Sequence, residues 1–145
     1  MNTKVEKALN EQIHAEFFSF YLYLSVSAYF SSQHLDGFAH WMRIQAQEEF
    51  GHAMKLFDYL NERGGSVQLA AMEAPQREWA SPSAAVEAVL NHERHISARI
   101  NELVNLANSV KDHATTVVLH WYVNEQVEEE ATAETLFHQV HMMEG

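Results

Sequence analysis

The chain has 145 residues, of which 47% are hydrophobic, and it contains five glycines, two prolines and no cysteine. This composition favours one domain, residues 1–145, made of long helices, and it excludes a disulfide framework, a thiolate metal site and an iron–sulfur cluster. The formal charge of −11 makes nucleic acid and anionic membranes poor partners and cations natural ones. The most apolar run, residues 17–30, is too short and too rich in serine to span a bilayer. Because no secretion signal is recognisable, we expect a cytoplasmic protein.

A first helix is predicted from about Thr3 to Tyr29. Its inward stripe recurs every three or four residues and consists of Val5, Leu9, Gln12, Glu16, Ser19, Tyr23, Val26 and Phe30. Glu16 lies in the middle of this stripe, where a lone buried carboxylate is costly. Further aromatic residues at positions 17, 18, 20 and 21 spread round the helix, and we expect them to pack against another chain.

A second helix is predicted from about Gly37 to Arg63, with Asp36 as its N-cap and Gly64-Gly65 as its C-cap. Its stripe consists of Phe38, Met42, Gln45, Glu49, His52, Leu56 and Tyr59. Glu49 and His52 are three residues apart, so both side chains lie on one face of the helix, at a spacing suited to binding one metal ion.

The same spacing occurs in Glu11 and His14, and alone it is a weak signal in a chain with 20 acidic residues and 10 histidines. Glu11 and His14 fall roughly 140° to 160° round the helix from Glu16, so we expect that pair to be exposed.

Residues 64–81 lack periodicity and contain Pro75, which indicates a long crossover rather than a tight turn. An extended segment of ~17 residues can span the ~39 Å length of a helix of roughly 26 residues. Ser81-Pro82 then begins a third helix as N-cap and first residue. The stripe of this helix consists of Val86, Val89, Glu93, Ile96, Ile100, Val104 and Ala107.

Glu93 is central in the third stripe, although the polar run at 91–95 leaves a solvated face as the alternative. Asp112 is expected to cap a fourth helix, whose stripe consists of Thr115, Val118, Tyr122, Gln126, Glu129, Ala133, Leu136 and Val140. Of the three consecutive acids at 128–130, Glu130 is assigned to solvent.

The predicted fold is therefore an all-α four-helix bundle with one long crossover connection. Four glutamates and one histidine lie mid-helix on inward faces: Glu16, Glu49, His52, Glu93 and Glu129. Several buried carboxylates need a cation or protons, and this ligand set is that of a dinuclear metal site in a helical bundle. Carboxylates with one imidazole suit iron(II), manganese or zinc, and iron is favoured where redox chemistry is required.

These motifs resemble the bacterial non-haem ferritins. The resemblance is carried by Glu16 with Tyr23, by Ala46-Gln47-Glu48-Glu49-x-x-His52, by Glu93, and by Trp121-Tyr122-x-x-Glu125-Gln126-x-Glu128-Glu129-Glu130, and it extends to about residue 140. It implies a first iron held by Glu16, Glu49 and His52, and a second held by Glu49, Glu93 and Glu129, with Gln126 close by. Glu48, Glu125 and Glu128 match a third iron site, Tyr23 matches a tyrosine beside the centre, and Trp121 matches a neighbouring aromatic. No haem is predicted.

The resemblance implies an iron-storage ferroxidase that uses dioxygen or hydrogen peroxide and forms a homo-oligomeric cage of twenty-four subunits. The family's short C-terminal fifth helix is missing from the predicted elements. The route by which iron would enter is not determined by the sequence. The alternative is a di-iron peroxidase or oxygenase of the rubrerythrin kind on the same bundle, against which the absence of cysteine and of a Glu-x-x-His on the fourth helix argues. A passive cation-binding scaffold is a third, weaker alternative.

Overall fold

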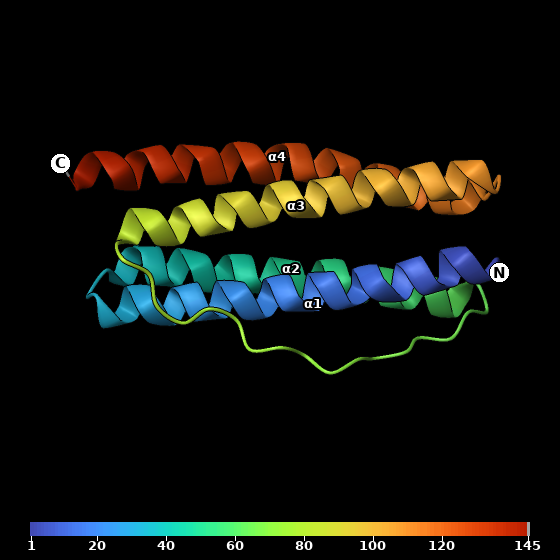
Figure 1. Ribbon diagram of the computed structural model, residues 1–145, viewed down its shortest axis with the longest axis horizontal. Helices are drawn as coiled ribbons and strands as arrows, with labels where there is room; N and C mark the ends of the chain where they lie inside the picture. The colour runs from blue at the N-terminus through green and yellow to red at the C-terminus, as the bar shows by residue number, and fades with distance from the viewer. Residues whose placement is uncertain (145) are drawn as a thin grey trace. The chain divides into compact units, whose positions relative to one another are not determined.

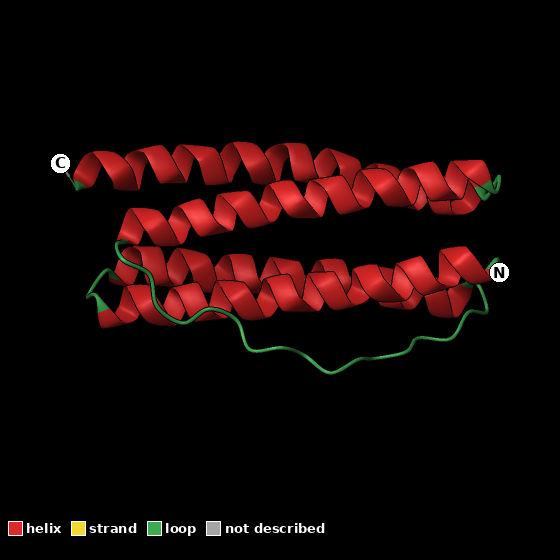
Figure 2. Ribbon diagram, viewed as in Figure 1, coloured by secondary structure: helices red, strands yellow, loops and turns green. Residues whose placement is uncertain are grey.

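The computed structural model describes residues 1–144, and this part of the chain contains four helices and no strand (Figures 1 and 2). The helices are α1 (Thr3–Ser32), α2 (Asp36–Glu62), α3 (Pro82–Ser109) and α4 (His113–Met143). Their order agrees with the prediction, and their ends differ from it by a few residues. Among the described residues, no helix combines the length and the hydropathy needed to cross a membrane. The chain divides after Ala80 into two compact units, which are described separately below.

The first unit contains α1, α2 and the connection that follows them, and α1 packs against α2. Every residue of the stripe predicted for α1 is buried. In α2 the prediction holds for Met42, Glu49, His52 and Leu56, whereas Phe38, Gln45 and Tyr59 are only half-buried. The buried places are taken instead by the residues that directly follow those three: Ala39, Ala46 and Leu60. The bulkier side chains thus lie at the margin of the helix contact.

The turn between α1 and α2 corrects one prediction. Asp36 is the first helical residue of α2 and not its N-cap; that position is held by Leu35, which makes no side-chain capping bond. The reason is that the turn is very short. The N–H of Leu35 donates to Phe30 O at 2.9 Å, which closes α1, while Leu35 O accepts from Ala39 N at 3.0 Å, which opens α2. The Asp36 carboxylate still lies in the first turn, where the helix dipole favours negative charge.

The end of α2 confirms the predicted glycine cap. Gly64 has φ +74°, a left-handed conformation that glycine adopts at little cost. Its N–H donates to Asn61 O at 3.1 Å, and the N–H of Gly65 donates to Leu60 O at 3.0 Å. These two bonds form a Schellman motif and satisfy carbonyls that the end of the helix would leave unpaired.

The connection after α2 runs along α1, as Figure 1 shows. Contacts appear in the same order along both segments. Asn10 accepts from Gln68 N at 2.7 Å, His14 lies 3.5 Å from Glu73, Ser25 donates to Gln76 O at 2.6 Å, and Tyr29 packs edge-on against Trp79. The segment therefore passes along most of α1 as an extended, hydrogen-bonded strap, as expected of a crossover.

The second unit contains α3 packed against α4, with both predicted N-caps in place. The Ser81 hydroxyl accepts from Ala84 N at 3.1 Å and Pro82 is the first helical residue, while the Asp112 carboxylate accepts from Thr115 N at 3.1 Å. Most of the two predicted stripes is buried. The exceptions are Val104 and Val118, which are half-buried, and their neighbours Leu103 and Leu119 are buried instead.

An aromatic cluster lies on the surface of the first unit. The Phe50 ring of α2 is 5.9 Å from the Phe17 ring and 5.5 Å from the Phe20 ring of α1, yet 45% of Phe50 is exposed. Tyr21 is 44% exposed. Such a surface is consistent with the predicted contact to another chain, which stays a prediction.

Candidate metal centre

Glu16 is fully buried near the middle of α1. Gln12, one turn earlier, donates from its side-chain Nε2 to Glu16 Oε1 at 3.0 Å, whereas the other carboxylate oxygen, Oε2, accepts no hydrogen bond. Burial, and next the negative charge of Glu49, raise the pKa of Glu16 well above its usual range, although His52 and the Gln12 hydrogen bond act in the opposite direction. Glu16 Oε2 is therefore a buried oxygen atom that needs either a proton or a bound cation.

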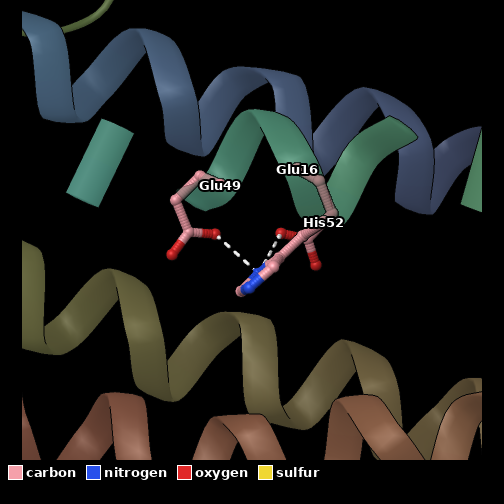
Figure 3. A group of neighbouring side chains, drawn as sticks. All are labelled: Glu16, Glu49 and His52. Carbon is pink, nitrogen blue, oxygen red and sulfur yellow. Dashed lines mark ion pairs between the residues drawn. The ribbon is translucent and has the colours of Figure 1, made fainter. Parts of the chain in front are cut away.

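Glu49 and His52 approach Glu16 from one face of α2 (Figure 3). Their exposed fractions are 1% and 5%. His52 Nδ1 lies 3.3 Å from Glu49 Oε2 and 3.9 Å from Glu16 Oε2, so the imidazole points between the two carboxylates. The three-residue spacing predicted to bring Glu49 and His52 together does so, because α2 is continuous through both residues.

One ligand atom from each of Glu16, Glu49 and His52 can be chosen so that all three lie within 4.8 Å of one another. Two carboxylates this close repel each other in a buried environment, and a divalent cation would remove both the repulsion and the unpaired oxygen. An oxygen and nitrogen ligand set of this kind suits a first-row transition metal such as iron(II). The first unit thus presents a set of side chains that fits a metal ion.

Glu93 is fully buried in α3, which excludes the solvated face left open for it by the sequence. Glu93 accepts hydrogen bonds from Gln126 of α4, whose Nε2 donates to Glu93 Oε2 at 3.0 Å and to Glu93 O at 3.1 Å. Beside Glu93, burial and next the neighbouring His95 and Arg99 side chains lower the pKa of His92 to about 4, so His92 is neutral at physiological pH. Glu129, one turn after Gln126, is 9% exposed.

The remaining candidates differ in their surroundings. Glu48 and Glu128 are exposed, Glu125 is half-buried, and Tyr23 is 1% exposed. Trp121 is 36% exposed and packs edge-on against the ring of Tyr122 at 4.9 Å.

The pair with the same spacing as Glu49 and His52 was predicted to be exposed, which holds for Glu11 but not for His14, which is half-buried. Glu11 is exposed, and His14 lies 3.5 Å from Glu73 of the crossover. A spacing of three residues therefore identifies a candidate site only in combination with the inward stripe.

One residue was assigned wrongly and one was missed. Glu130 was assigned to solvent, but it is half-buried and accepts a hydrogen bond from the hydroxyl of Ser97 at 2.6 Å. Ser97 also lies 3.2 Å from Gln126 Nε2. The available signal was the spacing: Ser97 follows Glu93 by four residues, and Glu130 follows Gln126 by four.

Comparison with known proteins gives the family. The sequence model of the ferritin-like domain matches residues 6–143. The chain belongs to the ferritin family. Among curated ferritins, it is 46% identical over 134 residues to a bacterial non-heme ferritin of Bacteroides fragilis, and the match covers 92% of this chain and 84% of that protein.

Two solved ferritins are similar over almost the whole described fold. An open pore ferritin from Archaeoglobus fulgidus superposes with a TM-score of 0.97 at 52% identity, covering 99% of this chain and 87% of that one. A Chlorobium tepidum ferritin also has a TM-score of 0.97, at 39% identity, covering 100% of this chain and 88% of that one. These similarities confirm the predicted fold class, an all-α four-helix bundle of the ferritin type, with no fifth helix among the described residues. Membership of the ferritin family also makes iron the metal implied for the buried Glu and His cluster.

Proposed function

We propose that this protein oxidises iron(II) to iron(III) at a centre within each subunit and stores the product as a ferric mineral. The observation that carries the proposal is the buried group of Glu16, Glu49 and His52, in which one Glu16 oxygen accepts no hydrogen bond. A stable fold gains nothing from burying two carboxylates side by side, so the arrangement is best explained by a cation that binds there.

Iron(II) is the substrate in this proposal, and two ions bind together. Glu16, Glu49 and His52 hold the first ion, and Glu49 also contacts the second, which is held by Glu93 and Glu129. Gln126 acts on this second position as a hydrogen-bond donor to Glu93. Glu48, Glu125 and Glu128 form a third, weaker iron position, in accordance with the exposure of Glu48 and Glu128.

The reaction balances in electrons and protons. Each of two iron(II) ions gives up one electron, and dioxygen takes both electrons and two protons to become hydrogen peroxide. With hydrogen peroxide as the oxidant, two electrons and two protons yield two molecules of water. The surrounding carboxylates favour the more highly charged iron(III) product.

A missing ligand explains why the oxidised iron would move on. The proposed second position has a Gln126-x-x-Glu129 sequence where a symmetric site would have a second Glu-x-x-His. It therefore has fewer strong ligands than the first, which favours release of iron(III) over permanent retention. Tyr23, two helical turns beyond Glu16 on the same buried face of α1, is proposed to lie beside the centre.

Storage requires an enclosed space, and we propose that identical subunits assemble into a cage of twenty-four in the cytoplasm. The surface aromatic cluster of Phe17, Phe20, Tyr21 and Phe50, in which Tyr21 and Phe50 are exposed, supports a contact between subunits. The net charge of −11 favours attraction of iron(II).

The test is aerobic addition of iron(II) to metal-free protein, followed by optical measurement of iron(III) formation and by sizing of the product. Glu49→Ala should slow the initial oxidation by at least about tenfold, since it removes the ligand proposed for both ions. Glu62→Ala, an exposed glutamate at the end of the same helix, is the matched control and should oxidise iron normally.

Oxidation at the normal rate in Glu49→Ala would contradict the site. A small oligomer that keeps only two irons per subunit would instead favour the di-iron peroxidase or oxygenase alternative over storage.

A further inference from the structure

Four side chains of α3 and α4 form a continuous chain of hydrogen bonds. The Ser97 hydroxyl donates to Glu130 Oε2 at 2.6 Å. Gln126 Nε2 donates to Ser97 Oγ at 3.2 Å, and the same amide nitrogen donates to Glu93 Oε2 at 3.0 Å. These hydrogen bonds therefore connect Glu130, which is half-buried, to the fully buried Glu93.

The direction of these bonds follows from the number of protons available. An ionised carboxylate can only accept, so the single hydroxyl proton of Ser97 is committed to Glu130. Toward Gln126, Ser97 can then only accept, which requires the nitrogen of the Gln126 amide on that side and not its oxygen. With the amide oriented in this way, one N–H donates to Ser97 and the other is shared between Oε2 and the backbone oxygen of Glu93.

The reversed amide would be unfavourable for the same reason. Rotation of the Gln126 side-chain amide by half a turn would place its carbonyl oxygen against the Glu93 carboxylate and against a Ser97 hydroxyl whose proton is already used. Two acceptor oxygens would then face each other in a buried environment. Ser97 and Glu130 thus select one of two amide orientations of similar shape.

We propose that Ser97 and Glu130 are positioning residues for the second iron position: they hold the Gln126 amide as a donor that fixes the Glu93 carboxylate in its ligating orientation. This inference rests on the proposed function, because it takes Glu93 as a ligand. It extends the site by two residues, neither of which contacts the metal.

The effect is expected on one metal ion only. Hydrogen-bond partners of metal ligands typically contribute about 10- to 100-fold to metal affinity, and Ser97 acts one step further away, through Gln126. Ser97→Ala should therefore weaken the ion bound by Glu93 by about tenfold and leave unchanged the ion bound by Glu16, Glu49 and His52.

Calorimetric titration of the metal-free assembled protein with Zn²⁺, which undergoes no oxidation, tests this directly. Glu93→Ala and Glu16→Ala first identify which binding step belongs to which position. Ser97→Ala should weaken the step that Glu93→Ala removes, and Ser97→Thr, which keeps the hydroxyl, should restore it. Glu130→Ala should weaken the same step by at least about threefold, because the Ser97 proton is then no longer committed.

Glu134→Ala is the matched control, since it removes an equal charge from an exposed residue one turn further along α4, and it should leave both steps unchanged. Equal weakening of both steps by Ser97→Ala, failure of Ser97→Thr to restore binding, or an unaltered Glu93 step in Ser97→Ala would each overturn the positioning role. If neither Glu16→Ala nor Glu93→Ala removes a step, the proposed function itself fails, and the positioning role fails with it.

Discussion

Glu144 binds Ser83 with both carboxylate oxygens, one accepting the Ser83 backbone N–H at 2.8 Å and the other the Ser83 hydroxyl at 2.5 Å. Ser83 lies in the first turn of α3, and Glu144 directly follows the last residue of α4. The carboxylate thus satisfies an N–H that the start of a helix leaves unpaired, and it joins the two ends of the hairpin.

The hydrogen bonds from Ser83 lower the pKa of Glu144, so this contact should make stability depend on pH. A carboxyl group whose pKa is lower in the folded state stabilises the fold above its unfolded pKa, and this contribution disappears as the pH falls through the lowered value. Glu144→Ala should therefore unfold at a lower denaturant concentration than wild type at pH 7. The difference should shrink as the solution is acidified through the carboxyl range.

Glu134→Ala should show no such difference, because Glu134 is exposed and belongs to no comparable cap. A pH-independent difference between Glu144→Ala and wild type would show that the carboxylate charge is not the cause.

Glu16 should have the opposite pH dependence in metal-free protein. Its pKa is raised by burial and by Glu49, so the folded state is favoured while Glu16 is protonated and loses stability as the pH rises through the raised value. Glu16→Gln keeps the oxygen that accepts from Gln12 but carries no charge. Denaturation of the metal-free proteins should show the variant to be more stable than wild type at pH 8, with a smaller difference at pH 5.

Zinc addition should then stabilise wild type more than Glu16→Gln, which lacks one ligand of the first proposed position. The prediction fails if the variant is the less stable protein at pH 8. If both results are obtained, the Glu16 carboxylate lowers the stability of the metal-free fold and serves to bind metal.

Two non-glycine residues have left-handed backbone conformations at helix ends. His34 follows α1 with φ 59°, and Lys111 follows α3 with φ 60°. Side chains with a Cβ atom are disfavoured there, and Gly64 shows that glycine serves the same position after α2. His34→Gly and Lys111→Gly should each raise the free energy of unfolding by about 0.5–1 kcal/mol.

Asn105→Gly is the control for Lys111→Gly. Asn105 is exposed within α3, where glycine only adds freedom to the unfolded chain, so this change should lower the free energy of unfolding by roughly half a kcal/mol. Chemical denaturation of the variants side by side tests this. The explanation is wrong if Asn105→Gly and Lys111→Gly change the free energy of unfolding in the same direction.

Gly51 lies inside α2, and a Cβ atom added there would meet nothing within 4 Å in this chain. Gly51→Ala should raise the free energy of unfolding by up to about 1 kcal/mol, because alanine favours the helix. Gly65→Ala should instead destabilise the protein, because its Cβ would overlap the buried Leu60 side chain. If Gly51→Ala is also destabilising, the side of α2 next to Phe50 must be packed against another subunit.

Much of this fold could be predicted because each helix carries a continuous inward stripe. Glu16 and Glu93 are the clearest cases: nothing in their immediate neighbours marks them, but the period of their helices places both in the core, and both are fully buried. The caps at Ser81 and Asp112 were predicted for a similar reason, since the chemistry of a helix N-terminus is local.

The misassigned residues depend on contacts between segments. Asp36 has the chemistry of an N-cap, but the short turn uses Leu35 to close α1 and open α2 at once. Glu130 looks solvated within its own helix, and only the neighbouring α3 supplies the Ser97 hydroxyl that binds it. Such contacts depend on how one helix is positioned along its neighbour. The periodicity within a single helix does not reveal that position.

The division of the proposed ligands between the two halves of the chain bears on how the protein folds. Glu16, Glu49 and His52 come from two helices joined by a short turn, so they can meet through local contacts, which form faster than distant ones. During synthesis, α1, α2 and the strap along α1 leave the ribosome before α3 and α4. A nascent chain would therefore hold two carboxylates and an imidazole before it is complete, and metal ions in the surrounding fluid could bind to the growing polypeptide.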